Sequence, residues 1–367
     1  MNRHEFFIRK TLDLAEKGRY NVSPNPMVGA VLVKGKKVIS SAYHKRVGGL
    51  HAEAMAIKKA GKRARGADLY VNLEPCVHKG RTPACVDAIV QSGIKRVFCA
   101  MKDPNPLNNG LGVKKLRKKN ISVKVGIFEK EALALNHVFV KYITKNMPFV
   151  ILKMAESLDG KIATKTGDSK WITSDMSRRY VHRLRSEVDA ILIGVNTIEK
   201  DNPLLTSRGQ KNPIKVILDP DFKVQLRSRI FTKKSPALSI VVIGKNKLSR
   251  KDVLEKIKGF SRKGILVISC IRKKGLFDLS TLLKELADLE ISRLLIEGGG
   301  KTAAGFLEQG LVDRVMFFIS PLIIGGKDAV TSVEGSGIDR IKQALRLKNI
   351  GIKQIGQDIL INGDLIN

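Results

Sequence analysis

Four residues in the first quarter of the chain have the types and spacing of a catalytic metal site: His51, Glu53, Cys76 and Cys85. One imidazole and two thiolates give a zinc ion three protein ligands and leave its fourth position open, as catalytic zinc sites do. The start of a predicted helix at Cys85 favours the thiolate of that residue. Water at the open position would ionise near neutral pH and become a nucleophile.

Glu53 is predicted to move protons rather than to bind the metal. Two residues after His51, it can take a proton from the metal-bound water and pass it to a ring nitrogen and a leaving amine. A His and a Glu near a helix start are common, because the helix dipole favours the Glu there. His-x-Glu followed by Pro-Cys and a second Cys that opens a helix is typical of zinc-dependent nucleobase deaminases.

The spacing of the two cysteines points to a small substrate. Nucleic-acid deaminases usually carry Pro-Cys-x-x-Cys, whereas eight residues separate Cys76 from Cys85 in this chain. The intervening loop holds His78, Lys79 and Arg81, whose polar groups suit a small phosphorylated molecule.

The elements that must position these residues alternate along the first part of the chain. Such alternation of strands and short helices indicates a three-layer α/β domain. The predicted helices span 4–18, a segment from 51, 83–93 and 110–120, the predicted strands span 27–33, 36–44, 68–75, 96–101 and 122–128, and an amphipathic stretch covers 129–145.

The pattern restarts near Pro148, before a new apolar strand. Since a chain of 367 residues is too long to fold around one hydrophobic core of ordinary size, we expect two domains, residues 1–146 and 147–367. The second is also predicted to be α/β, with strands at 189–197, 214–219, 238–244 and 264–270, a helix at 280–290, a strand, glycine turn and helix within 292–310, and late strands within 313–326.

Composition favours a cytoplasmic enzyme. An apolar content of 43% supports buried cores, and no apolar run approaches a membrane span. The four cysteines do not resemble a secreted disulfide framework, and the amphipathic start is not an export signal. A reducing compartment would leave thiols free to bind metal.

The formal net charge of +33 would attract polyanions. The basic residues are spread along the whole chain, however, and aromatic residues, at 5%, do not interleave with them. We therefore expect solvated basic faces and small phosphorylated substrates, with no nucleic-acid or membrane partner.

Two further features lie in the second half. The segment 297–305, Glu-Gly-Gly-Gly-Lys-Thr-Ala-Ala-Gly, follows a strand and opens a helix, where backbone N–H groups can approach an anion. Its spacing is not that of a dinucleotide-binding G-x-G-x-x-G turn. Trp171, the only tryptophan, lies in a polar loop within 152–174.

The chain resembles the bifunctional deaminase/reductase family of riboflavin biosynthesis. The resemblance rests on residues 23–33, 43–44, 51–53, 73–85 and 103–106, and continues through 152–174 and 297–305. It implies a cytidine-deaminase-like domain that removes the 2-amino group of a diaminopyrimidinone ribosylamine 5′-phosphate. It also implies a dihydrofolate-reductase-like domain that uses NADPH to convert the ribosyl group to ribityl, and a dimer or tetramer.

The same resemblance implies a set of binding residues. The residues that would bind the pyrimidine or its phosphate are Asn25, His44, His78 and Arg81. In the reductase, the substrate residues would be Lys153, Ser169, Arg185, Leu205, Arg208 and Glu297. The cofactor residues would be Ala155, Trp171, Thr197, Asp201, Gly298, Gly299, Gly300, Lys301 and Thr302, with Asp201 also the catalytic acid.

The chain departs from the family pattern at five positions, of which Val77 and Lys79 lie in the loop after Cys76. Leu50 and Ala84 stand where the family commonly has proline, and Pro220 stands where it often has a small hydroxyl residue. Pro220 offers neither an N–H nor a hydroxyl to a cofactor. Two other functions remain open, a nucleic-acid deaminase with an appended domain and a non-catalytic scaffold with structural zinc.

Overall fold

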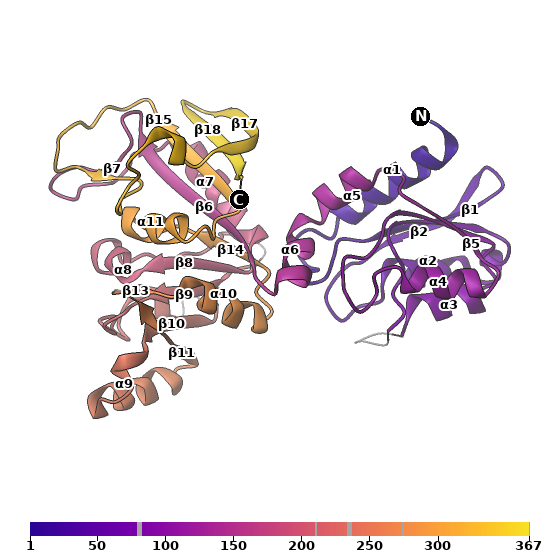
Figure 1. The fold of residues 1–367 in the computed structure, drawn as a ribbon, viewed down its shortest axis with the longest axis horizontal. Coiled ribbons are helices and arrows are strands. Elements are labelled where there is room, and N and C mark those ends of the chain that lie inside the picture. Colours follow the sequence, from indigo (N-terminus) through magenta and orange to yellow (C-terminus); the bar gives the residue numbers. More distant parts are fainter. Residues whose placement is uncertain (79–82, 210, 233–236, 274, 367) are drawn as a thin grey trace. The chain divides into compact units, whose positions relative to one another are not determined.

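The chain divides between Met147 and Pro148 into two units in the computed structural model, and each unit has its own central sheet (Figure 1). The structure describes residues 1–78, 83–209, 211–232, 237–273 and 275–366. None of the helices in these ranges combines the length and the apolar character that a membrane span requires.

The first unit contains a five-stranded sheet in the order β2-β1-β3-β4-β5. β1 is antiparallel to β2 and β3, whereas β3, β4 and β5 are parallel. The strands are β1 (Gly29–Lys34), β2 (Lys37–Tyr43), β3 (Asp68–Leu73), β4 (Arg96–Met101) and β5 (Ser122–Val125). The helices are α1 (Arg3–Glu16), α2 (Ala52–Ala60), α3 (Cys85–Gln91), α4 (Leu111–Lys118), α5 (Glu129–Leu135) and α6 (His137–Lys145), with a 3-10 turn η1 at Gly61–Ala64.

Helices cover both faces of this sheet, with α2, α3 and α4 on one side and α1 and α5 on the other (Figure 1). This confirms the three-layer arrangement expected from the sequence. Because both faces are covered, β3 is buried along its whole length. The carboxyl ends of the parallel strands β3 and β4 meet at one edge, so the segments after Leu73 and Met101 lie close together.

One close approach at this edge requires glycine. A Cβ atom at Gly112, in the first turn of α4, would lie 2.2 Å from the carbonyl oxygen of Pro75. Glycine therefore lets α4 pack against the segment that follows β3.

The second unit contains a nine-stranded sheet in the order β11-β10-β9-β8-β14-β6-β15-β18-β17. Its strands are parallel from β11 to β15, and β18 and β17 add an antiparallel edge. These strands are β6 (Phe149–Ser157), β8 (Ala190–Gly194), β9 (Ile214–Leu218), β10 (Ser239–Gly244), β11 (Ile265–Cys270), β14 (Arg293–Ile296), β15 (Arg314–Ser320), β17 (Leu347–Ile355) and β18 (Asp358–Leu365).

Helices and short strands connect this sheet. The helices are α7 (Asp175–Glu187), α8 (Val195–Asp201), α9 (Lys251–Ser261), α10 (Leu279–Asp288) and α11 (Gly300–Glu308), with 3-10 turns η2 (Arg229–Phe231), η3 (Lys245–Lys247) and η4 (Ile341–Gln343). Two small antiparallel pairs join β7 (Lys161–Ala163) to β16 (Val330–Thr331) and β12 (Arg272–Lys273) to β13 (Leu276–Phe277).

Several predicted elements differ in extent. The stretch 129–145 is two helices, separated at Asn136, whose buried side chain accepts from the Met27 N–H at 2.8 Å and donates to the Met27 carbonyl at 3.1 Å. The strand predicted at 122–128 ends at Val125. Residues 321–326 are not a strand, because Pro321 lacks a donor and Gly325 and Gly326 have positive φ.

Candidate functional site

His51, Cys76 and Cys85 come together at one edge of the first sheet. His51 precedes α2, Cys76 follows β3, and Cys85 is the first residue of α3. Their ligand atoms lie within 4.8 Å of one another. The His51 Nδ1 is 3.2 Å from the Cys85 Sγ and 3.6 Å from the Cys76 Sγ.

The donor set fits zinc. One imidazole nitrogen and two sulfurs converge from three separate elements, and the backbone N–H of Cys85 donates to the Cys76 sulfur at 3.4 Å. Hydrogen bonding to the Cys85 thiol lowers the pKa of Cys76 to about 4, which favours a thiolate, the form that binds metal. Three ligands leave one position for water or substrate.

Glu53 lies beside this cluster in the first turn of α2 and is 4% exposed. Burial raises the pKa of its carboxyl group to about 7. The Cys85 thiol hydrogen bonds to the same carboxyl group. A carboxyl group with this pKa can both accept and release a proton near neutral pH.

His44 and Asn25 lie next to the cluster. The His44 ring meets the His51 ring edge-on, with centroids 5.4 Å apart. The Asn25 amide lies 3.1 Å from the His44 Nε2, and the His44 Nδ1 lies 3.2 Å from the carbonyl oxygen of Leu50. Burial lowers the pKa of His44, so the ring is neutral and its Nδ1 donates to Leu50.

Two other predicted residues of this site, His78 and Arg81, follow Cys76 in the chain. His78 is exposed, and Arg81 lies outside the described residues. Ala84, which stands where the family commonly has proline, has φ −61°, an angle that proline also adopts. This departure therefore leaves the entry to α3 unchanged.

Two cavities adjoin in the second unit. One has a volume of about 540 Å³ and the other about 650 Å³. Four residues line both of them, Ile162, Ser169, Thr197 and Asp201. The predicted acid Asp201 thus lies at the junction of the cavities, where its carboxylate is 3.8 Å from the Lys170 ammonium group.

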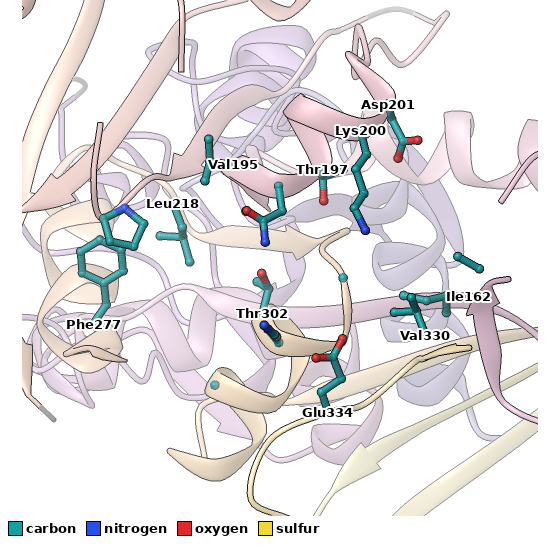
Figure 2. Close-up of a pocket in the computed structure, with 18 of the residues that line it drawn as sticks. Ile162, Val195, Thr197, Lys200, Asp201, Leu218, Phe277, Thr302, Val330 and Glu334 are labelled. Atoms are coloured by element: carbon teal, nitrogen blue, oxygen red, sulfur yellow. The ribbon is translucent and has the colours of Figure 1, made fainter. Parts of the chain in front are cut away.

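The first cavity holds most of the predicted cofactor residues. Thr197 and Asp201 line it, as do Gly299, Gly300, Lys301 and Thr302 at the start of α11. Figure 2 shows Lys200 and Glu334 reaching into it from opposite sides, with Leu218 and Phe277 towards its other end. Pro220 lines the same cavity. Gly298 is not among the lining residues, and a Cβ there would lie 2.6 Å from the Thr302 side chain.

The second cavity brings together all the predicted substrate residues of the reductase: Lys153, Ser169, Arg185, Leu205, Arg208 and Glu297. Two predicted cofactor residues, Ala155 and Trp171, also line this cavity rather than the first. The Arg178 guanidinium lies 4.5 Å from the centre of the exposed Trp171 ring.

Arg185 and Glu297 form a buried ion pair, with two hydrogen bonds of 2.8 Å. Burial raises the pKa of Glu297, but the Arg185 charge more than offsets this, so the net pKa is lowered. The charge of the guanidinium is thus largely compensated by Glu297 within the wall of the second cavity.

The structure adds five basic residues to the second cavity that the sequence did not single out, Lys170, Arg178, Arg179, His182 and Arg229. Arg178 and His182 are on α7 together with Arg185. The spacing of four and then three residues places Arg178, His182 and Arg185 on one face of the helix. This spacing could have indicated from the sequence that the three side chains lie together.

The comparisons with known proteins cover both units. Residues 1–101 match the zinc-binding region of cytidine and deoxycytidylate deaminases, and residues 148–361 match the RibD C-terminal domain. The riboflavin biosynthesis protein RibD of Aquifex aeolicus is 45% identical over 97% of this chain and 96% of that protein. The chain belongs to the RibD family.

Solved RibD structures share the fold of the whole chain. A RibD structure from Acinetobacter baumannii is 33% identical and covers 99% of both chains, with a TM-score of 0.88. A Thermotoga maritima structure, described as a diaminohydroxyphosphoribosylaminopyrimidine deaminase/5-amino-6-(5-phosphoribosylamino)uracil reductase, is 36% identical with a TM-score of 0.80. These RibD matches confirm the expected fold class, a deaminase-like unit followed by a reductase unit.

Proposed function

We propose that the chain catalyses two steps of riboflavin biosynthesis. The first unit, predicted as residues 1–146, would deaminate 2,5-diamino-6-ribosylamino-4(3H)-pyrimidinone 5′-phosphate. The second, residues 147–367, would reduce the ribosyl group of 5-amino-6-(5-phosphoribosylamino)uracil with NADPH. The observation that carries this proposal is that one chain holds both a His-Cys-Cys cluster beside a buried glutamate and two adjoining cavities.

In the deaminase, His51, Cys76 and Cys85 would hold zinc, which when bound polarises water for attack on the ring carbon. Glu53 would take one proton from the attacking water and give it to the ring nitrogen, and would then transfer the hydroxyl proton of the adduct to the amine. The carbon–nitrogen bond then breaks, a carbonyl remains, and ammonia leaves. Asn25 and His44 would orient the pyrimidine, with His78 and Arg81 towards its phosphate.

In the reductase, the first cavity would hold NADPH, which supplies a hydride. The glycines and Lys301 at the start of α11 would meet its phosphates. The second cavity would hold the substrate, with Arg208 and Lys153 towards the sugar phosphate. Asp201, at the junction of the two cavities, would act as the acid that supplies a proton to an atom next to the ribose C1′.

Two observations argue against the other functions. A nucleic-acid deaminase with an appended domain would not need a second unit of the reductase family. A scaffold with structural zinc would not need a buried carboxyl group beside the metal ligands. We therefore propose small phosphorylated pyrimidines as substrates and no nucleic-acid partner, in the reducing cytoplasm that suits the free cysteines.

We also propose a homo-oligomer. β17 is the outer strand of the nine-stranded sheet, and its Ile350 and Ile352 are 59% and 73% exposed. An apolar edge strand can pair with its copy in a second chain. Light scattering should give a dimer or tetramer, and Ile352→Lys should lower the mass; a monomeric wild type would contradict this proposal.

A coupled assay tests the two activities. The purified chain with zinc should release ammonia from the diaminopyrimidinone, and added NADPH should then be consumed. Glu53→Ala should lose ammonia release by about 10²-fold or more, and Asp201→Ala should lose NADPH oxidation. If ammonia does not appear although zinc is bound, the deaminase assignment is wrong.

A further inference from the structure

Cys76 lies in a segment without regular secondary structure, between the end of β3 and residue 78. One side of this cysteine is tied to α3, since the Val86 N–H donates to the Cys76 carbonyl at 3.2 Å. On the other side, the Asn108 side chain contacts the backbone before and after the cysteine. Its Oδ1 accepts from the Val77 N–H at 3.0 Å, and its Nδ2 donates to the Pro75 carbonyl at 3.4 Å.

Asn108 is itself held in place. It is fully buried, and its Nδ2 also donates to the Asp103 Oδ2 at 3.0 Å. The second Asp103 oxygen accepts from the Asn105 N–H at 2.9 Å. The amide therefore has a fixed orientation, with its oxygen towards Val77 and its nitrogen towards Pro75 and Asp103.

Glu74 connects this loop to the sheet and to α4. It is 2% exposed, and its carboxylate accepts from the N–H groups of Asp103 at 3.1 Å, Gly110 at 2.9 Å and Val113 at 2.9 Å. The segment before Cys76 and the loop 103–110 are thus one hydrogen-bonded body. Since its polar groups are buried, removing one partner leaves others unsatisfied, which costs more than the lost hydrogen bond itself.

We propose that Asn108 is a positioning residue that fixes the Cys76 thiolate for zinc binding, a role that rests on the proposed zinc site. Its hydrogen bonds go to the backbone on both sides of Cys76 and to Asp103, so it acts on the metal through the cysteine. Residues that orient metal ligands typically change metal affinity by 10–100-fold when they are substituted.

Zinc affinity of the full-length reduced apo-protein tests the proposal. Competition with a chromophoric chelator should give a zinc Kd about 10–100-fold higher in Asn108→Ala than in the wild type. Asn108→Asp keeps an acceptor for the Val77 N–H but cannot donate to Asp103, so its Kd should be intermediate. Asn109→Ala alters the neighbouring residue of the same type, which is exposed, and should bind zinc like the wild type.

Two further measurements separate this role from a merely structural one. Urea unfolding of the apo-proteins reports the stability of each variant; a lower midpoint with an unchanged zinc Kd would overturn the proposal. So would equal zinc affinity in the wild type and both Asn108 variants. If Asn108→Ala does not fold, Asn108→Asp supplies the comparison. If Cys76→Ala binds zinc like the wild type, the zinc site itself is wrong, whatever Asn108 does.

Discussion

Arg185 illustrates how a side chain of the predicted type can have a different immediate partner. The family resemblance implies that it binds the substrate, and the structure also pairs it with Glu297 in the wall of the second cavity. In this pair the Arg185 guanidinium holds the Glu297 carboxylate in position, and it has less charge left to attract a second anion. If the cavity binds the substrate as proposed, we expect the phosphate to be bound mainly by its other basic residues, Arg208 among them.

Arg185→Ala should destabilise the second unit, because it leaves the Glu297 carboxylate buried without its partner. We expect the free energy of unfolding to fall by about 3 kcal/mol. Arg183→Ala, at an exposed position on the same helix, should leave it nearly unchanged. Urea unfolding followed by the fluorescence of Trp171, the single tryptophan of the chain and part of the second unit, measures both; equal midpoints for the two variants would contradict the prediction.

The clustering of the candidate metal ligands could be predicted from the local sequence. His51, Glu53, Cys76 and Cys85 lie at the ends of strongly patterned elements, so their neighbours in the chain already indicate a common edge. Asn108 has no such signal, because its contacts with Pro75 and Val77 arise from tertiary packing.

At the scale of elements, the strands that carry both sites were predictable because most of their residues are apolar and buried. β3 and β9 are examples. The break between α5 and α6 was not, since it depends on the contact of Asn136 with Met27. The hairpin of β17 and β18 was not predicted either; exposed residues along β17 and a register irregularity between Lys348 and Gly351 obscure its alternation.

β9 also contains a buried lysine that should affect how the free energy of unfolding depends on pH. Lys215 is 1% exposed and its Nζ donates to the Ile230 carbonyl at 2.9 Å, and burial lowers its pKa to about 8. Between about pH 8 and about pH 10.4, the ordinary lysine pKa, the unfolded chain binds more protons than the folded chain. The contribution of Lys215 to the free energy of unfolding therefore rises with pH across this range.

Lys215→Met should remove this rise, whereas Lys223→Met, at an exposed position, should keep it. Urea unfolding at pH 8, 9 and 10 compares the three proteins. The same pH slope in Lys215→Met as in the wild type would show that burial does not depress the lysine pKa.

At the scale of the whole molecule, the chain combines two units with separate sheets and separate sites. The family matches follow the same division, with residues 1–101 in one and 148–361 in the other. The alternation of strands and helices, together with Pro148 before a new apolar strand, was enough to predict two α/β domains. The shared cavity walls of the second unit could not be predicted, because they join loops that are far apart in the sequence.

Zinc removal should therefore affect one activity alone. After treatment with a chelator, ammonia release should fall to background, while NADPH oxidation with the deaminated substrate should stay within twofold of its starting rate. Added zinc should restore ammonia release. Loss of both activities on chelation would contradict the separation of the two sites.

The four residues that the two cavities of the second unit have in common, Ile162, Ser169, Thr197 and Asp201, place molecules bound in the two cavities against the same side chains. We therefore expect a molecule in one cavity to change the affinity of the other cavity for its own ligand. Thermodynamic reciprocity makes the change equal in both directions. Calorimetric titration of NADP⁺ with and without the ribityl product, and the reverse titration, should give the same coupling factor. Its sign decides whether the spent cofactor retains the product or expels it.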